Sequence, residues 1–204
     1  MSLPLLQWRR SVAAAYTLAR AAAESGHPSQ GWLHWRAARD DLFRAHPASP
    51  LSPAARAGFA GLPFAAYDPS LRFTLPVLPT DPAHLDVPTG TDGVVPFDRL
   101  GRVELPGLGS LDVWWLGSYG GGVFVPIRDG SAGQSTYGGG RYLLDTIKGA
   151  DLGGDDGMLV IDLNFAYHPS CAYDEAWACP LAPPGNVISA KITAGELLPP
   201  GGWT

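Results

Sequence analysis

Beyond residue 62, turn-forming pairs interrupt the chain every few residues. These closely spaced turns leave room only for short secondary-structure elements. The pairs are Asp68-Pro69, Asp81-Pro82, Asp92-Gly93 and Pro106-Gly107. Aspartate, glycine and proline each favour turns for a separate steric or hydrogen-bonding reason. The 26 glycines and 20 prolines among 204 residues favour short strands over a helical bundle.

Strand candidates lie between these turns, at residues 71–75, 102–105, 111–116, 123–127, 141–147 and 158–165. Near the end of the chain, residues 187–193 alternate between two sets of side chains. One set is Val187, Ser189 and Lys191, and the other is Ile188, Ala190 and Ile192. Such alternation is typical of a half-exposed strand. We therefore expect an antiparallel β-rich body, either a barrel or a sandwich.

The first 61 residues carry a different pattern, in which apolar residues recur every three or four positions. The first stripe comprises Leu5, Trp8, Val12, Tyr16 and Ala19, and the second comprises Trp32, Trp35, Ala38 and Leu42. This spacing predicts two amphipathic helices. Gly26 and Pro28 end the first, and Ser29 is the expected N-cap of the second. Ser52 and Pro53 predict the start of a short third helix.

Together these patterns predict an α+β fold, with two or three N-terminal helices packed on an antiparallel β-rich barrel or sandwich. A length of 204 residues suits one domain with a full-sized core. We expect that domain to span residues 1–204, with a helical part at 1–61 and a β-rich body at 62–204.

The net charge of −5 is distributed unevenly, at +4 in residues 1–60 and −9 in the remainder. Nucleic-acid binding needs a clustered basic surface, so the acidic body argues against that class of partner. No apolar run approaches the roughly 18–20 residues that span a bilayer, and the N-terminus lacks a signal-peptide pattern. The sequence therefore predicts a cytoplasmic protein with no membrane or nucleic-acid partner.

Polar residues that could hold a ligand crowd into the strand-like segments of the second half. They are Arg128, Tyr137, Arg141, Asp162, Asn164 and Tyr167. An arginine fork suits a carboxylate or phosphate on a ligand, but it equally suits an internal partner such as Asp129, Asp145 or Asp162. A small-molecule pocket and an internal ion-pair network both fit this pattern.

Three consecutive glycines, 138–140, stand before Arg141 and could bring backbone N–H groups close to an anion. A phosphate loop needs a helix behind it, whereas a strand-like segment follows here, so a β-bulge or tight bend is the alternative. No serine-hydrolase elbow or zincin motif is present. Catalytic residues stay unassigned, no cofactor is predicted, and the sequence leaves open whether the protein is an enzyme.

His168, Cys171 and Cys179 have spacing compatible with metal ligands. Structural zinc sites usually show two tight ligand pairs, and only one pair is present. The two cysteines could instead form a disulfide or remain reduced as small apolar side chains. All three interpretations stay open.

Aromatic residues are dense in the same half of the chain and could line a pocket or pack in the core. They are Tyr119, Tyr137, Tyr142, Tyr167, Tyr173, Trp114, Trp115 and Trp177.

The chain resembles a family of bacterial and archaeal proteins, domain-of-unknown-function family 1684, along nearly its whole length. The matching segments are Arg39-Asp-Asp-Leu-Phe-Arg, His46-Pro, Ser49-Pro-Leu, Tyr67-Asp-Pro, Arg72-Phe, Phe124-Val-Pro-Ile-Arg-Asp, Tyr137-Gly-Gly-Gly-Arg-Tyr-Leu, Asp162-Leu-Asn-Phe-Ala-Tyr, His168-Pro-Ser-Cys-Ala-Tyr, Cys179-Pro-Leu-Ala-Pro-Pro with Asn186, and Ala194-Gly-Glu. Members commonly have Phe where this chain has Leu163, and often Asn where it has His168, which weakens a zinc-ligand role for His168. The resemblance implies one domain and no established activity.

Three hypotheses of function follow from the sequence. The first is a small-molecule-binding domain or enzyme, whose Arg, Tyr, Asp and Asn residues accept an anionic ligand. The second is a structural or protein-interaction module, in which the same residues are scaffold. The third is a metal-binding protein that uses His168, Cys171 and Cys179.

Overall fold

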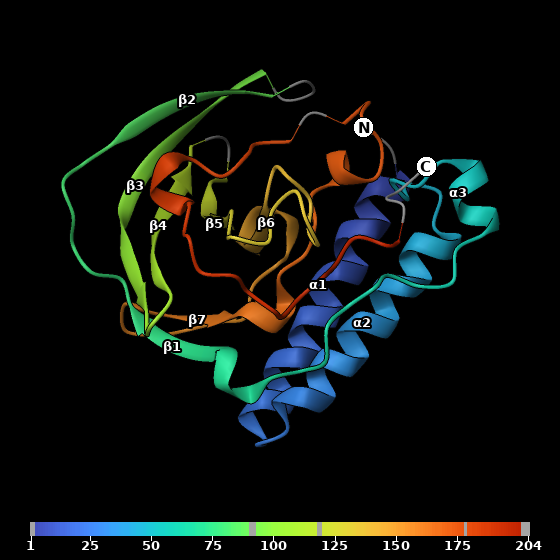
Figure 1. Ribbon diagram of the computed structural model, residues 1–204, viewed down its shortest axis with the longest axis horizontal. Coiled ribbons are helices and arrows are strands. Elements are labelled where there is room, and N and C mark those ends of the chain that lie inside the picture. Colours follow the sequence, from blue (N-terminus) through green and yellow to red (C-terminus); the bar gives the residue numbers. More distant parts are fainter. Residues whose placement is uncertain (1–2, 90–92, 118–119, 178, 201–204) are drawn as a thin grey trace.

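The computed structural model describes residues 3–89, 93–117, 120–177 and 179–200. Two long helices, α1 (Leu3–Glu24) and α2 (Pro28–Ala45), run side by side in opposite directions (Figure 1). Gly31 of α2 permits their close approach, because a Cβ at this position would lie 2.9 Å from the backbone of Ala19. The short helix α3 (Pro53–Ala57) follows.

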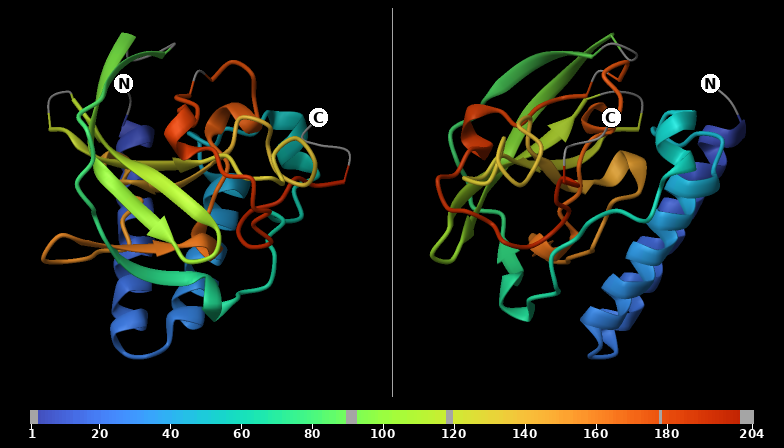
Figure 2. Two further views of the ribbon diagram at one scale, coloured as in Figure 1. Left: turned by 60° about the vertical axis from the view of Figure 1, so that its left-hand side comes forward. Right: turned by 45° about the vertical axis from the view of Figure 1, so that its right-hand side comes forward.

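The β-rich body consists of two antiparallel sheets. The strands are β1 (Arg72–Pro76), β2 (His84–Thr89), β3 (Gly93–Leu105), β4 (Gly109–Leu116), β5 (Gly122–Ile127), β6 (Arg141–Asp145) and β7 (Met158–Asp162). Strands β2 to β6 form one sheet in sequence order, and β1 pairs with β7 in the other. Helices α1 and α2 lie along one side of this body (Figure 2). The predicted α+β arrangement of N-terminal helices and antiparallel sheets is confirmed.

The five-stranded sheet is open, and β2 and β6 are its edges among the described residues. Of the two architectures that the sequence allowed, the closed barrel therefore does not form. Strand β3 bends at a register shift between Arg99 and Gly101 as it crosses the sheet. Such irregularities increase twist without closing a sheet.

Short 3-10 helices precede β1, link β6 to β7 and follow β7. They are η1 (Pro69–Leu71), η2 (Thr146–Lys148), η3 (Leu163–Phe165), η4 (Ser170–Ala172) and η5 (Pro184–Asn186). The predicted strand at 141–147 therefore ends at Asp145, and the one at 158–165 ends at Asp162. At both ends an aspartate side chain accepts a hydrogen bond from a following backbone N–H, which turns the strand into η2 or η3.

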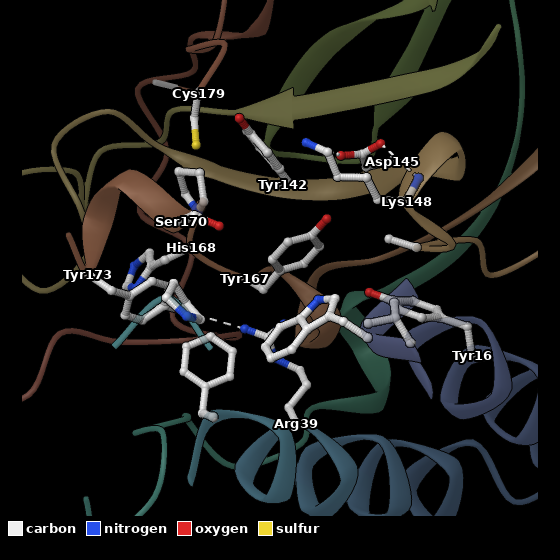
Figure 3. A pocket seen from close by; sticks show the side chains of 16 residues that line it. Tyr16, Arg39, Tyr142, Asp145, Lys148, Tyr167, His168, Ser170, Tyr173 and Cys179 are labelled. Carbon is white, nitrogen blue, oxygen red and sulfur yellow. Dashed lines mark hydrogen bonds and ion pairs between the residues drawn. The ribbon is translucent and has the colours of Figure 1, made fainter. Parts of the chain in front are cut away.

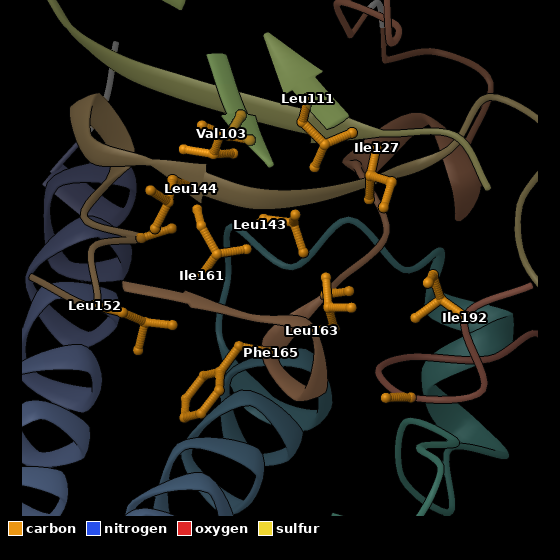
Figure 4. Close-up of a cluster of buried hydrophobic side chains, with 14 of the residues drawn as sticks. Val103, Leu111, Ile127, Leu143, Leu144, Leu152, Ile161, Leu163, Phe165 and Ile192 are labelled. Atoms are coloured by element: carbon orange, nitrogen blue, oxygen red, sulfur yellow. The ribbon is translucent and has the colours of Figure 1, made fainter. Parts of the chain in front are cut away.

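One large apolar cluster joins the helices to both sheets. Tyr16 and Trp35 from the helical hairpin belong to the same cluster as Val103, Leu143 and Ile161 from the strands. Figure 4 shows the strand side chains above Leu163 and Phe165, with α1 at the left and α2 below. Trp35 and Phe165 approach to 4.7 Å between ring centroids. The hairpin is thus anchored on the β-rich body through aromatic packing.

Helix starts were predicted with mixed success. Ser52 caps α3 as expected, because its side chain accepts a hydrogen bond from the N–H of Ala55. The prediction of Ser29 as the N-cap of α2 is wrong, since the helix begins at Pro28 with His27 before it. Proline is well tolerated in the first turn of a helix, because backbone N–H groups there have no acceptor within the helix.

The prediction of a strand at 187–193 is also wrong, although its alternation is real. Ile188 and Ile192 are buried, whereas Val187, Ser189 and Lys191 are exposed. The segment forms only an isolated bridge to Arg128, and the N–H of Ile192 donates to the side chain of Asp129 instead of to a strand. Buried and exposed side chains therefore alternate along this segment although it does not pair as a strand of a sheet.

No helix among the described residues is long and apolar enough to cross a membrane. Asp92, in one predicted turn, and Tyr119, in the predicted aromatic group, lie outside the described residues.

Candidate functional site

A pocket lies where α1 and α2 meet the segment that runs from β6 to η4 (Figure 3). Its cavity volume is about 90 Å³. The lining residues are Trp8, Val12, Tyr16, Arg39, Phe43, Pro50, Tyr142, Asp145, Lys148, Ala150, Tyr167, His168, Pro169, Ser170, Tyr173 and Cys179. One wall comes from the helices and Pro50 and the other from residues about 90 or more positions later, so the pocket exists only in the folded chain.

The hydroxyl of Tyr16 is the most unusual polar group in this pocket. Tyr16 is 1% exposed, and its hydroxyl hydrogen has no acceptor among the described residues. The Trp35 ring packs edge-on against it with 5.8 Å between centroids. Burial raises the pKa of the phenol well above its ordinary value, although the charge of Arg39 and a hydrogen bond from Trp35 both lower it. The group therefore stays protonated and can donate.

Arg39 brings a buried cation to the pocket. Its Nη2 lies 3.0 Å from Oε2 of Glu196, which is fully buried. The guanidinium lies over the rings of Trp35, Phe43 and Tyr167, at 5.2, 5.1 and 4.9 Å from their centroids. Its Nε has no hydrogen-bond partner in the described part of the chain. The guanidinium of Arg39 is thus held in place, and its Nε–H is available to a ligand.

Glu196 organises the groups behind Arg39. It accepts hydrogen bonds from the hydroxyl of Tyr173 and from the backbone N–H of His168. Burial by itself would raise the pKa of Glu196, but Arg39, His168 and the Tyr173 hydrogen bond together bring it below its usual value. Glu196 is therefore ionised at neutral pH and pairs with Arg39.

His168 belongs to the same hydrogen-bond network as Glu196 and Tyr173. Its Nε2 accepts a hydrogen bond from the N–H of Tyr137 at 3.1 Å, so the ring proton resides on Nδ1 when the ring is neutral. Nδ1 lies 3.6 Å from Oε1 of Glu196. Both ring nitrogens thus face protein groups. Among the described residues no cluster of three or more His, Cys, Asp or Glu side chains could hold a metal ion.

The opposite side of the pocket carries Tyr142, Asp145 and Lys148. The hydroxyl of Tyr142 donates to the carbonyl oxygen of Pro180 at 2.6 Å. Nζ of Lys148 lies 3.4 Å from Oδ2 of Asp145, and the lysine side chain is 48% exposed. Lys148 therefore places an ammonium group at the solvent side of the pocket.

Cys171 and Cys179 are both free thiols, and both are partly buried. They contact each other, and Cys179 also lines the pocket. The hydrogen bond from Cys171 is the main cause that lowers the pKa of Cys179 to about 6, and it raises the pKa of Cys171. No disulfide links the two cysteines in this structure.

The six residues predicted to bind a ligand are not brought together in one pocket. Of these six, only Tyr167 lines the pocket described above. Arg128 is exposed, and its Nε donates to the carbonyl oxygen of Gly138 at 2.9 Å. Tyr137 lies behind His168, with 6.4 Å between ring centroids.

Arg141 is buried, and both of its terminal nitrogens bond to protein groups, whereas its Nε has no hydrogen-bond partner in the described part of the chain. Its guanidinium donates to the carbonyl oxygens of Ala194 and Ile192 and lies 3.3 Å from Asp129. The internal ion pair that the sequence allowed as an alternative is therefore the arrangement found. Arg141 fastens the C-terminal segment to β6.

Asp162 and Asn164 hold a loop in the same manner. Asp162 pairs with Arg72 at 3.1 Å and accepts a hydrogen bond from the Asn164 side chain at 2.7 Å. That side chain also donates to the carbonyl oxygen of Asp68 at 2.8 Å and accepts from its N–H at the same distance. These residues join β1 to the end of β7.

The glycine triplet 138–140 forms a tight bend before β6. Gly140 has φ +95°, and a Cβ there would lie 2.5 Å from the carbonyl oxygen of Ile127. Position 140 therefore needs glycine, because the backbone is left-handed there and passes close to Ile127. This agrees with the tight bend that the sequence allowed as the alternative to an anion-binding loop.

A second hollow, of about 370 Å³, is more open and lies between β3, β4 and η5. Its arginine, Arg102, already pairs with Asp112 at 2.8 Å. None of the buried polar atoms without a partner in the described residues lies in it. The first pocket is therefore the better candidate.

Residues 57–197 match the family described as Protein of unknown function (DUF1684). This chain belongs to that family. Its fold is similar to a solution NMR structure of an uncharacterized protein from Haloarcula marismortui, with 31% sequence identity and a TM-score of 0.62. That match covers 86% of this chain and 97% of the other. No curated protein matches the sequence.

The DUF1684 match begins after α2, so the helical wall of the pocket lies outside it. Sequence reasoning missed the residues of that wall, above all Tyr16 and Arg39. Arg39 stands four residues after Trp35 and four before Phe43, and this spacing places it on the buried aromatic face of the helix. A charged residue on such a face is a signal that could have identified it.

Proposed function

We propose that this protein binds a small organic molecule carrying an anionic group in the pocket between the helical hairpin and the segment from β6 to η4. The observation that carries this proposal is Tyr16 in the pocket wall, whose buried hydroxyl has no acceptor for its hydrogen among the described residues. Leaving a buried hydroxyl unpaired costs about 1–3 kcal/mol. A ligand oxygen that accepts from Tyr16 would recover this free energy.

The balance of donors and acceptors supports an anionic ligand. Burial raises the pKa of Tyr16 and Tyr167, so both phenols remain protonated at neutral pH. Arg39 adds a free N–H, and Lys148 adds an ammonium group. Against these donors, Asp145 is the carboxylate in the pocket wall. A carboxylate or another oxygen anion suits this excess of donors.

The cavity limits the size of the ligand and its affinity. At about 10–15 Å³ for each water molecule, 90 Å³ holds about six to nine waters, which corresponds to a ligand of about ten non-hydrogen atoms or fewer. Ligands of this size bind with dissociation constants between about 1 μM and 1 mM, given the usual free energy per atom. The rings of Trp8 and Phe43 would pack against its apolar part.

The test is an NMR titration of the full chain with a panel of small aliphatic and aromatic carboxylic acids at millimolar concentrations. We expect at least one acid to produce saturable shifts of residues that line the pocket. For that acid, Tyr16→Phe should weaken binding about 5- to 10-fold, the equivalent of one hydrogen bond. The same substitution should leave the unliganded protein equally stable or up to about 1 kcal/mol more stable, since it removes an unpaired buried polar atom.

Tyr67→Phe is the matched control. Tyr67 lies outside the pocket, and its hydroxyl donates to Asp162 at 3.3 Å. It should lose some stability and keep full affinity, which is the opposite of Tyr16→Phe. Equal affinity of the wild type and Tyr16→Phe for the acid would contradict the proposal, and so would a panel in which no acid binds.

The alternative of a structural or protein-interaction module is favoured by one specific observation. The guanidinium of Arg141 and the side chain of Asn164 are engaged with protein groups, which supports a scaffold role for them. This alternative concerns other residues than the proposed pocket, and it predicts that no acid in the panel binds at Tyr16.

A further inference from the structure

The two cysteines of the chain, Cys171 and Cys179, lie in contact beside the pocket. Cys171 belongs to η4, and Cys179 follows in the next loop. Their contact, and the opening of one of them onto a pocket, indicates chemistry between them.

The sulfur of Cys179 is surrounded by hydrogen-bond donors. The thiol of Cys171 donates to it, and so do the backbone N–H groups of Cys171 and Ser170. The ammonium group of Lys148 adds a favourable charge. Donors arranged in this way stabilise a negative sulfur, and they favour the thiolate of Cys179 over that of Cys171. The lowered pKa of Cys179, at about 6, agrees with this arrangement.

Only Cys179 forms part of the pocket wall, where its sulfur is drawn at the upper end of the space in Figure 3. Cys171 touches Cys179 but is absent from the lining residues. A molecule that enters the pocket therefore meets Cys179 first. Cys171 is then placed to react with whatever forms on Cys179.

We propose that Cys179 and Cys171 form a redox-active dithiol that reduces a low-molecular-weight disulfide, with Cys179 as the attacking thiolate and Cys171 as the resolving thiol. In the first step the Cys179 sulfur attacks one sulfur of the disulfide R–S–S–R. A new S–S bond forms, the old one breaks, and RS⁻ leaves with the electron pair.

In the second step Cys171 attacks the Cys179 sulfur of the mixed disulfide. The Cys171–Cys179 bond forms, the second RS⁻ leaves, and it takes the proton that Cys171 gives up. The two cysteine sulfurs are oxidised to one disulfide, and R–S–S–R is reduced to two thiols. This inference does not require the ligand proposed above, because the substrate reacts at Cys179 and not at Tyr16.

Several ionisable groups from different elements act on Cys179. They are Cys171 on η4, Lys148 on η2, Tyr142 on β6, Tyr137 before β6 and Tyr167 after η3. The tyrosines stay neutral near pH 7 because burial raises their pKa values, that of Tyr137 to about 12. Lys148 is the cation among these groups, so it provides a direct test of the electrostatic environment.

The experiment uses the reduced full chain with oxidised glutathione, quenching with a maleimide, and intact-mass measurement. We expect the wild type to lose two hydrogen atoms and to accept no maleimide. Cys171→Ser should stop at the first step, with one glutathione attached to Cys179. Cys179→Ser should react with glutathione at the rate of an ordinary thiol. Circular dichroism of each variant checks that it is folded.

The rate is best measured at about pH 5.5. There a thiol of pKa 6 is about 200-fold more ionised than an ordinary cysteine of pKa about 8.5, while its lower basicity reduces the reactivity of the thiolate about 10-fold. The first step in the wild type, which keeps the hydrogen bond from Cys171, should therefore be about 10- to 20-fold faster than adduct formation in Cys179→Ser. Lys148→Met should slow the Cys179 reaction at this pH, and Lys191→Met, which alters a lysine bonded to Gln134 instead, should not.

Two results would overturn the proposal. One is a wild-type protein that keeps two free thiols at glutathione ratios that oxidise simple dithiol peptides. The other is an equal rate of reaction for the wild type and Cys179→Ser at pH 5.5, which would mean that Cys179 has no special reactivity.

Discussion

Oε2 of Glu196 lies 3.0 Å from Nη2 of Arg39, and both side chains are almost completely buried. This ion pair joins α2 to the C-terminal segment, 157 residues further along the chain. It also keeps the guanidinium against the rings at the base of the pocket, so stability and pocket geometry depend on the same contact.

Replacing Glu196 by Gln should therefore be strongly destabilising. The change leaves the buried charge of Arg39 unpaired, which costs about 3–5 kcal/mol. Chemical denaturation of the purified variant measures the loss. Asp41→Asn removes the partner of Arg44 in an exposed pair and should change stability by less than about 0.5 kcal/mol. A loss of under about 1 kcal/mol for Glu196→Gln would show that the ion pair does not hold the hairpin.

The same carboxylate predicts a pH dependence of stability. The pKa of Glu196 is lower in the folded protein than its ordinary value of 4.5, so its contribution is complete above that value and disappears as the pH falls through the lower folded value. The stability difference between the wild type and Glu196→Gln should therefore shrink as the pH is lowered below about 4.5. Thermal melts of both proteins across the acid range measure this difference. A difference that stays constant would contradict the assignment.

Arg141 and Arg128 should behave in opposite ways when each is replaced by Met. Arg141→Met removes several buried hydrogen bonds and leaves Asp129 without its cation, with an expected loss of about 3–5 kcal/mol. Arg128 is exposed, and its replacement should cost less than about 1 kcal/mol. Urea denaturation of the two variants makes the comparison. Similar losses would argue against a scaffold role specific to Arg141.

The glycine bend before β6 offers a matched pair of substitutions. Gly140→Ala combines a left-handed φ of +95° with a contact 2.5 Å from a carbonyl oxygen, so we expect a loss of at least about 1–3 kcal/mol. Gly138→Ala meets nothing closer than 3.9 Å and should be neutral or slightly stabilising. Thermal unfolding distinguishes them. Equal tolerance would mean that the bend does not need glycine at position 140.

Capping residues and apolar periodicity predicted the helices, because both depend on residues that are close together in the sequence. Ser52 caps α3 because capping involves only neighbouring residues, and the apolar stripes placed Trp35 and Tyr16 in the core for the same reason. The exact start of α2 could not be predicted in this way, since His27, Pro28 and Ser29 are all compatible with a first turn.

The candidate pocket could not be predicted, because its groups depend on partners far away in the chain. Arg39 and Glu196 each look like surface residues until the fold brings them together. Conversely, Arg141 and Asn164 drew attention as polar residues in strand-like segments, and the partners that explain them are likewise distant. A polar residue in an apolar stretch indicates a special environment, but only the fold shows whether that environment is a scaffold or a pocket.

The pairing of β1 with β7 has a consequence for how the chain reaches its native state. Strands β2 to β6 pair with their sequence neighbours, whereas Arg72 pairs with Asp162, which lies 90 positions further along the chain. Loop closure of that length is slow compared with hairpin formation. We therefore expect the five-stranded sheet to assemble first, and the two-stranded sheet to complete the body in a later, rate-limiting step of folding.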